Sequence, residues 1–231
     1  MAAEYTSSGE VLKLMETYLA LYTTGKHGSF DQDAFDPRKA LLGGSISEFI
    51  RTFGQECIFG WTSMLMKKRV VVLGDDLAKV QSIVRTMPLF CWHRQDWSVL
   101  RPFIVASAAE LQELRSAGVF AAGCSDSAIK NSPELYDLLI DTNNRSVTVM
   151  DHAKDDFKMG KFHGEMAQML MQAVEEERGD QAIIKALANR TKELLAKIAG
   201  TTLSKDRPNA MERFMMNCGR ADNIELAYAD E

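Results

Sequence analysis

The sequence predicts an α/β protein, with a central lobe over residues 1–150 and an all-helical C-terminal region over residues 151–231. In the central lobe, short runs rich in β-branched residues alternate with helical patterns, which predicts a short mixed sheet flanked by helices. After residue 150, apolar residues recur at helical spacing with polar turns between them. A chain of 231 residues is also long enough to bury a full core.

Composition and charge narrow the function classes. The apolar fraction of 46% and the charged fraction of 26% are typical of a globular protein, and we expect a cytoplasmic one. A net charge of −5 argues against a nucleic-acid partner. No apolar run approaches the roughly 18–20 residues of a membrane span, and the first residues, MAAEYTSSGE, do not resemble a secretory signal. The four cysteines lie far apart, which predicts free buried thiols.

The first helical pattern is predicted to end at Gly25, and residues 26–44 are predicted to form an exposed connection. Ser45 and Glu48 have the spacing of a capping box, in which each side chain accepts a backbone N–H bond. The apolar residues behind them predict one long helix over residues 46–65, apolar on more than one side.

Residues 70–73, Val-Val-Val-Leu, predict a strand covered on both faces. Asp75 or Asp76 is then expected to cap a helix that Pro88 ends. The inner face of that helix is predicted to consist of Val80, Ile83, Val84 and Met87.

A second capping box, Ser107 and Glu110, predicts a short helix that ends at Gly118. Residues 119–124 predict a strand of small residues, and a hairpin of two short strands is predicted within residues 138–150.

Two apolar stripes separated by the polar residues 175–180 predict an αα-hairpin. A link at Pro208 leads to a weaker helical segment over residues 211–228. The methionine-rich stripe over residues 159–171 favours adaptable packing over a cofactor site, although methionines also suit a partner helix.

No catalytic residue, metal or cofactor is expected. Cys91 and His93 are the one close Cys/His pair, where a zinc site needs a second. His163 and Glu165 lack the H-E-x-x-H spacing, and Cys91 is better read as a small apolar filler than as a nucleophile. Residues 70–76 hold one glycine where a dinucleotide fingerprint needs three, and no P-loop is present.

Two clusters of residues each allow two interpretations. Lys67, Lys68 and Arg69 are either a basic binding patch or a solvated helix C-terminus, where cations complement the helix dipole. The stretch LFCWHRQDW, residues 89–97, is either an interface hot spot or a corner of the core.

Residues 53–100 resemble the central segment of a DENN domain. The resemblance rests on a Phe-Gly-x-Glu helix, a basic pair before a hydrophobic strand, a Met-Pro helix end and a Trp-His turn. These elements are Phe53, Gly54 and Glu56; Lys68 and Arg69; Met87 and Pro88; and Trp92 and His93. The next family motif, an IPVLP-like segment, is matched in a shifted position by Ser98-Val99-Leu100 and Pro102. Of the later Pro-Phe…Gly strand, only Val119-Phe120 and Gly123 are matched.

The resemblance implies structural and binding roles for these residues. Phe53, Gly54, Glu56, Pro88 and Trp92 would be the core signature, with Trp92 anchoring the central lobe. His93, Arg94 and Asp96 are expected to face outward or to pair with each other, and Trp97 suits either the core or the surface. The candidate partner-binding residues are Lys67, Lys68, Arg69, Arg94, Asp96 and Trp97.

DENN proteins act on Rab GTPases, many as guanine-nucleotide exchange factors, so the resemblance implies a Rab-family GTPase as partner. Such a factor performs no covalent chemistry, because it works by binding the nucleotide-free GTPase more tightly. A divergent member of the family is associated with late endosomes and with coiled-coil subunits of the Commander recycling assembly. Membrane association would then be indirect and peripheral to late endosomes.

Two hypotheses follow, a Rab-directed exchange module and a scaffold subunit that exchanges nothing. The chain begins almost where the central lobe should, so the family's N-terminal longin-like lobe is expected to be absent, which favours the scaffold. An exposed groove lined by Arg94, Asp96 and residues 67–69 would favour exchange. A buried Arg94–Asp96 arrangement beside a closed surface would favour the scaffold.

Overall fold

The computed structural model describes residues 15–20, 23–24, 26–27, 30–31 and 44–229. The chain divides into two compact units, Met1–Leu41 and Leu42–Glu231. In the first unit, residues 15–20 are helical, as predicted, and strand β1 (Lys26–His27) pairs antiparallel with β2 (Phe30–Asp31). The predicted helix end at Gly25 lies outside the described residues, as do most of residues 26–44.

The second unit is built around a five-stranded mixed sheet, with the strand order β4-β5-β3-β6-β7. The first four strands in that order run parallel, and β7 is antiparallel to β6. The strands are β3 (Arg69–Leu73), β4 (Leu100–Ile104), β5 (Phe120–Cys124), β6 (Leu138–Asp141) and β7 (Ser146–Val149). This confirms the predicted fold class, the predicted strands at β3 and β5, and the predicted hairpin, which is β6 and β7.

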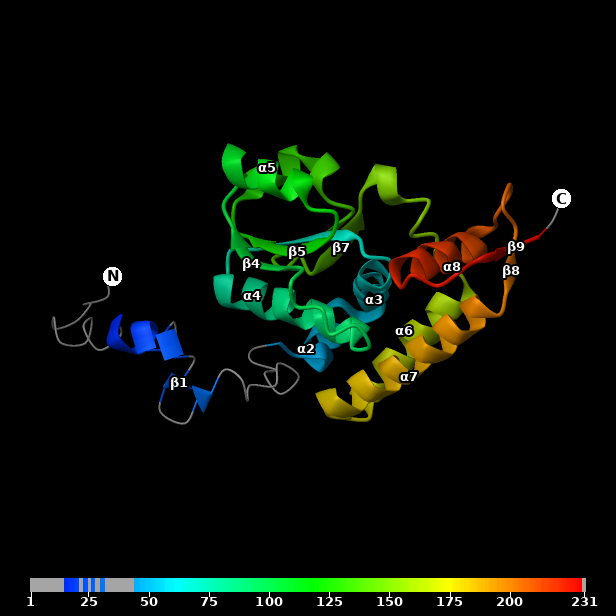
Figure 1. The fold of residues 1–231 in the computed structure, drawn as a ribbon, viewed down its shortest axis with the longest axis horizontal. Helices are drawn as coiled ribbons and strands as arrows, with labels where there is room; N and C mark the ends of the chain where they lie inside the picture. The colour runs from blue at the N-terminus through cyan, green and yellow to red at the C-terminus, as the bar shows by residue number, and fades with distance from the viewer. Residues whose placement is uncertain (1–14, 21–22, 25, 28–29, 32–43, 230–231) are drawn as a thin grey trace. The chain divides into compact units, whose positions relative to one another are not determined.

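Helices cover both faces of the sheet, with α4 (Leu77–Thr86) on one face and α5 (Ala108–Ser116) on the other (Figure 1). The central strand β3 is therefore buried on both sides, as its run of valines predicts. Asp76 caps α4, since its carboxylate accepts the N–H bonds of Ala78 and Lys79. The predicted inner face of α4 is confirmed by the burial of all four of its residues: Val80, Ile83, Val84 and Met87.

The long helix predicted over residues 46–65 is wrong in one respect, because it is broken at Gly54. The segment consists of α2 (Ile46–Phe53), the 3₁₀ helix η2 (Gly54–Glu56) and α3 (Cys57–Leu65). Gly54 has φ +55° and ψ −131°, a conformation that side chains disfavour and that a continuous helix does not allow.

Both predicted capping boxes are only half formed. Ser45 accepts the Glu48 N–H bond, but its own N–H donates to Thr86 Oγ1 at 3.1 Å instead of to the Glu48 carboxylate. Ser107 accepts the Glu110 N–H bond, while the Glu110 carboxylate accepts from Val105. In each case a tertiary or adjacent partner replaces the reciprocal bond.

Further short elements connect the strands. Pro88 lies in the 3₁₀ helix η3 (Met87–Cys91), and Pro133 opens η5 (Pro133–Leu135). The remaining 3₁₀ segments are η4 (Ser127–Asn131) and η6 (Asp151–Ala153). Strand β4 was not expected from the sequence, because Pro102 and half-exposed positions give it no clear strand pattern.

The C-terminal region is mainly helical. Helices α6 (Lys161–Glu175) and α7 (Asp180–Ala199) form the predicted αα-hairpin and lie side by side (Figure 1). The last helix, α8 (Ala210–Ala221), is shorter than predicted, because the chain turns at Asn223, where φ is +55°. It continues into β9 (Ala227–Tyr228), which pairs with β8 (Thr202–Leu203).

Trp61 connects the central lobe to the helical region. It is fully buried, its ring packs on Phe162 and Phe214, and its Nε1 donates to Thr191 Oγ1 at 3.2 Å. Residues 42–231 form one compact unit. The boundary expected at residue 150 between the central lobe and the helical region stays a prediction. No described helix combines the length and the apolarity that a bilayer span requires.

Candidate functional site

Arg94 extends inward from the turn after η3. Its guanidinium donates to both carboxylate oxygens of Asp222, at 2.6 and 2.8 Å, and to the carbonyls of Met64 and Leu65 at the end of α3. The Arg94 and Asp222 side chains are each 13% exposed. The expectation that Arg94 faces outward or pairs with Asp96 is wrong, because its partner lies 128 positions along the chain.

Asp222 is the anion at the centre of this cluster. Burial alone would raise the pKa of Asp222, but the hydrogen bonds from His93 and Arg94 and the charge of Arg94 outweigh it and hold the pKa well below its usual range. His93 Nε2 lies 3.3 Å from both Asp222 oxygens. The cluster therefore fixes the end of α8 on the η3 turn and on α3.

The residues of the basic run 67–69 serve different purposes. Lys67 is exposed and has φ +53°, as expected for the residue that closes a helix. Lys68 pairs with Asp156. Arg69 donates to both oxygens of Asp137, at 2.8 to 3.2 Å. Of the three residues, only Lys67 therefore matches the alternative of a solvated helix C-terminus, and the pairing of Lys68 and Arg69 within the fold argues against an open basic patch.

Asp137 is held by hydrogen bonds from two sides, Arg69 and His152. Although burial would raise its pKa, hydrogen bonds from Arg69 and His152 and the Arg69 charge keep the pKa of Asp137 below its ordinary value. Arg69 also donates to the Glu134 carbonyl. The network ties the start of β3 to the segment before β6, so Arg69 is largely occupied within the fold.

The tryptophan stretch forms a turn. Trp92, the expected core anchor, is only half-buried, and the tryptophan of the core is Trp61. Asp96 accepts bonds from the N–H and the hydroxyl of Ser98, at 3.0 and 2.6 Å. Trp97 is half-buried, and its Nε1 has no hydrogen-bond partner among the described residues.

Lys67, Arg94 and Asp96 do line a common hollow, together with five apolar residues or cysteine. Its volume is about 20 Å³, which is the space of a single water molecule. The exposed groove that would favour nucleotide exchange is therefore not formed by these residues.

The other signature residues support the fold. Phe53 and Pro88 are buried, and Gly54 makes the break between α2 and α3. The Glu56 carboxylate accepts the Val147 N–H bond at 3.0 Å, which links this break to β7.

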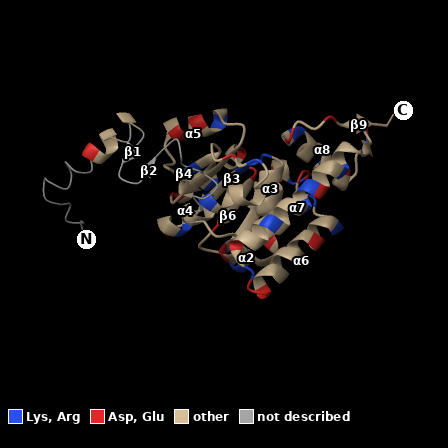
Figure 2. Ribbon diagram, turned by 60° about the horizontal axis from the view of Figure 1, so that its bottom comes forward, with Lys and Arg blue, Asp and Glu red and all other residues tan. Residues whose placement is uncertain are grey.

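A groove between α6 and α7, which we call the α6–α7 groove, was indicated by the methionine stripe alone. Its volume is about 220 Å³. Its apolar lining consists of Phe162, Met166, Met169, Leu194 and Met211, and its charged lining of Glu165, Arg190, Glu193 and Lys197. Acidic and basic segments follow each other along both helices (Figure 2). The charged rim comes from two helices, so no single stretch of sequence could reveal it.

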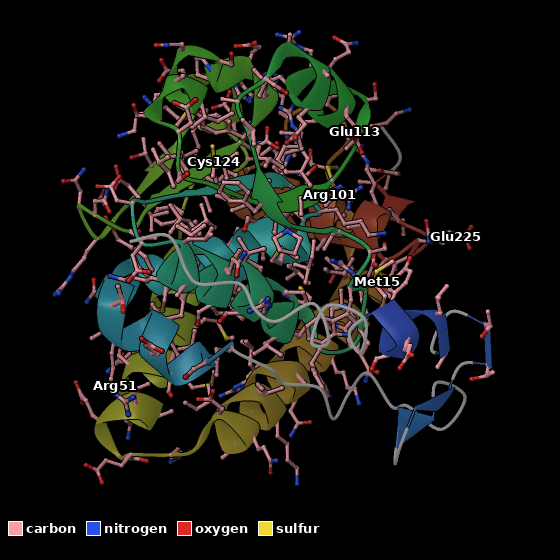
Figure 3. The ribbon with its side chains drawn as sticks, turned by 90° about the vertical axis from the view of Figure 1, so that its left-hand side faces the viewer. Met15, Arg51, Arg101, Glu113, Cys124 and Glu225 are labelled. Carbon is pink, nitrogen blue, oxygen red and sulfur yellow. The ribbon has the colours of Figure 1, made fainter. Side chains whose placement is uncertain are left out.

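The cysteines are poorly suited to nucleophilic chemistry. All four are buried, and burial raises the pKa of Cys57 and Cys91 to about 12. Cys124 lies inside the sheet layer (Figure 3). The only imidazole near Cys91 in sequence, His93, is directed at Asp222. Among the described residues, no three His, Cys, Asp or Glu side chains are grouped as metal ligands.

Comparison with known proteins gives one family match and several relatives. Residues 44–151 match the family described as "SPA: Stabilization of polarity axis". DENN domain-containing protein 10 of Dictyostelium discoideum is 36% identical, over 97% of this chain and 67% of that protein. The human protein of the same name is 36% identical over 84% and 56%, and that of Danio rerio 32% over 95% and 68%. The chain thus spans between about half and two thirds of the length of these relatives.

Proposed function

The chain belongs to the family of DENN domain-containing protein 10. From this premise we propose that it takes part in the regulation of Rab GTPases in late-endosomal vesicle traffic through protein–protein interactions. Its proposed role is that of a scaffold, which docks a helical partner and performs no covalent chemistry. The α6–α7 groove is the observation that carries this proposal. A coiled-coil subunit of the Commander assembly is the kind of partner that we propose for it, with the membrane reached indirectly.

The groove has the chemistry of a helix-binding surface. Methionine side chains adapt to irregular apolar partners, and three of them lie in this groove. A helix from a coiled coil presents an apolar seam flanked by charges of both signs. The apolar floor with Glu165 and Glu193 beside Arg190 and Lys197 is complementary to such a seam.

Replacing Met169 by glutamate is expected to weaken binding of a Commander coiled-coil subunit at least tenfold, because it places a charged group against the apolar seam. Met169 is half-buried at the groove surface, so the fold should tolerate the change. The measurement is a calorimetric titration with purified coiled-coil subunits.

The matched control is Met171→Glu. Met171 is also half-buried on α6 but lines a different hollow, beside Gln55 and Gln172. Equal binding losses for both variants, or no loss for Met169→Glu, would refute docking in the α6–α7 groove. Thermal unfolding of each variant checks that neither result comes from a damaged fold.

Guanine-nucleotide exchange is the second candidate, and family membership favours it. An exchange factor stabilises the nucleotide-free GTPase, so it requires a surface that binds the GTPase and no residues for covalent catalysis. The predicted cations do not provide that surface, because Lys68, Arg69 and Arg94 are engaged with Asp156, Asp137 and Asp222.

We therefore expect this 231-residue chain to leave GDP release from a panel of Rab GTPases at its intrinsic rate. Release of a fluorescent GDP analogue measures this, with the longer Dictyostelium relative as a parallel sample. If only the relative accelerates GDP release, exchange requires the part of the relative that this chain does not match. Acceleration of tenfold or more by the chain itself would overturn the scaffold proposal in favour of exchange.

A further inference from the structure

A second hollow, which we call the α8 pocket, lies apart from the α6–α7 groove. It is formed by α8, the connection from β8 to α8, the last residue of β9 and the segment after η6. Its volume is about 400 Å³. Its lining consists of Asp156, Lys205, Pro208, Arg213, Met216, Asn217, Arg220 and Tyr228. None of these residues belongs to the groove proposed for the helical partner.

The α8 pocket carries an excess of positive charge. Within the described part of the chain, Lys205, Arg213 and Arg220 form no ion pair, and the buried Nε of Arg213 has no hydrogen-bond partner. Asp156 is the one acidic residue in the lining, and its two oxygens accept from Lys68 and Asn217. Three cations thus face one pocket whose single anion is already neutralised.

Nearby acidic groups offset these cations only in part. Asp155 forms its ion pair with Lys158, although its exposed carboxylate also feels the charge of Arg213. The Glu212 carboxylate accepts the backbone N–H bonds of Ser204 and Asn209, at 3.2 and 2.8 Å. The ion-pair and hydrogen-bond partners of both acidic side chains are therefore groups other than the three pocket cations.

We propose that the α8 pocket binds a compact organic phosphate with two or more phosphoryl groups, namely an inositol phosphate, free or as a lipid headgroup. Guanidinium groups bind phosphate oxygens bidentately, and two arginines line this pocket. Its volume is within the range of small-molecule sites and exceeds what one phosphate fills. Cations gathered around one hollow suit a compact polyanion better than an extended acidic peptide, and Tyr228 and Pro208 offer apolar surface to a ring.

The test is a calorimetric titration of the chain with inositol trisphosphate. Arg213→Gln and Arg220→Gln are each expected to weaken binding about tenfold, because each removes a charge-assisted contact. Arg220 is exposed, so its replacement should leave the fold intact. The matched control is Arg115→Gln on α5, whose exposed guanidinium lies outside the pocket lining. Absence of binding, or an equal effect of the control, would overturn the proposal.

Two further arms define the ligand. Inorganic phosphate that binds as tightly as inositol trisphosphate would refute the requirement for several phosphoryl groups. Vesicles of phosphatidylcholine with phosphatidylinositol bisphosphate distinguish the sources: retention that depends on Arg213 and Arg220 supports a lipid headgroup, and binding of the soluble ligand alone supports a free inositol phosphate. Because Asp230 and Glu231 follow the pocket residue Tyr228 closely in sequence, the same arginine effects are required in a D230N/E231Q background.

Discussion

Replacing Asp222 by alanine is expected to lower the free energy of unfolding by about 3 kcal/mol, which is the range for breaking a buried ion pair. The reason is the position of Arg94, whose side chain is 13% exposed and would lose the one carboxylate that pairs with it among the described residues. The contacts of Arg94 with two carbonyls of α3 hold the charge in place, so it has no easy route to water. Urea unfolding followed by circular dichroism measures the change.

An exposed ion pair provides the control. Arg190 and Glu193 are 3.0 Å apart and are 59% and 65% exposed, so Glu193→Ala should cost under about 0.5 kcal/mol. In addition, Arg94→Leu combined with Asp222→Leu should cost less than the sum of the single changes, since no lone charge remains. Additive effects, or similar losses for Asp222→Ala and Glu193→Ala, would contradict a buried role for this pair.

The pH dependence of stability gives an independent view of Asp222. Its pKa in the folded protein is held below the ordinary carboxyl value near 4. The resulting stabilisation is complete above that ordinary value and is lost as the pH falls below it, because only the unfolded chain then gains the proton readily. Asp222→Asn should therefore lose less stability than the wild type on acidification below about pH 4.

Local chemistry explains the parts of the fold that the sequence could predict. A run of valines marks β3 because both faces of that strand are covered, and Asp76 caps α4 through bonds to residues only two and three positions away. The break at Gly54 was missed because a glycine inside a helical pattern has a modest cost and does not by itself end a helix.

The candidate site was harder to predict, because its contacts join distant parts of the chain. Arg94 and Asp222 are 128 positions apart, so no spacing rule relates them. Trp92 and Trp61 are the same residue type in aromatic surroundings, and only the packing of α6, α7 and α8 makes Trp61 the buried one. The methionine stripe indicates an apolar face on α6. The sequence of α6 alone does not show how much of that face α7 covers. Met166 is buried, whereas Met169 remains half-exposed in the groove.

His163 is a buried titratable group in the same aromatic core. It is 3% exposed, and its ring lies edge-on to Phe214 with the centroids 4.5 Å apart. Its Nδ1 accepts the Gly160 N–H bond at 3.2 Å, which requires that this nitrogen carry no proton. Burial lowers the pKa of His163 to about 4, from 6.5.

This depressed pKa predicts a loss of stability in mild acid. Above pH 6.5 the imidazole is neutral in both states, and between 6.5 and about 4 only the unfolded chain takes up the proton. The unfolding free energy should therefore fall by up to about 3 kcal/mol across this range, since one pKa unit corresponds to about 1.4 kcal/mol. Urea unfolding at a series of pH values measures the slope.

The variant that isolates this effect is His163→Gln, which has no titrating group at the position. It is expected to be less stable than the wild type at pH 7, because the ring contacts are lost, but to lack the wild-type decline between pH 6.5 and 4. His152→Gln is the matched control, since the His152 side chain is 43% exposed and lies outside this aromatic core. It should retain the decline. A slope that survives in His163→Gln would mean that another group takes up the proton, and that the aromatic core tolerates a charged imidazole at lower cost than its burial implies.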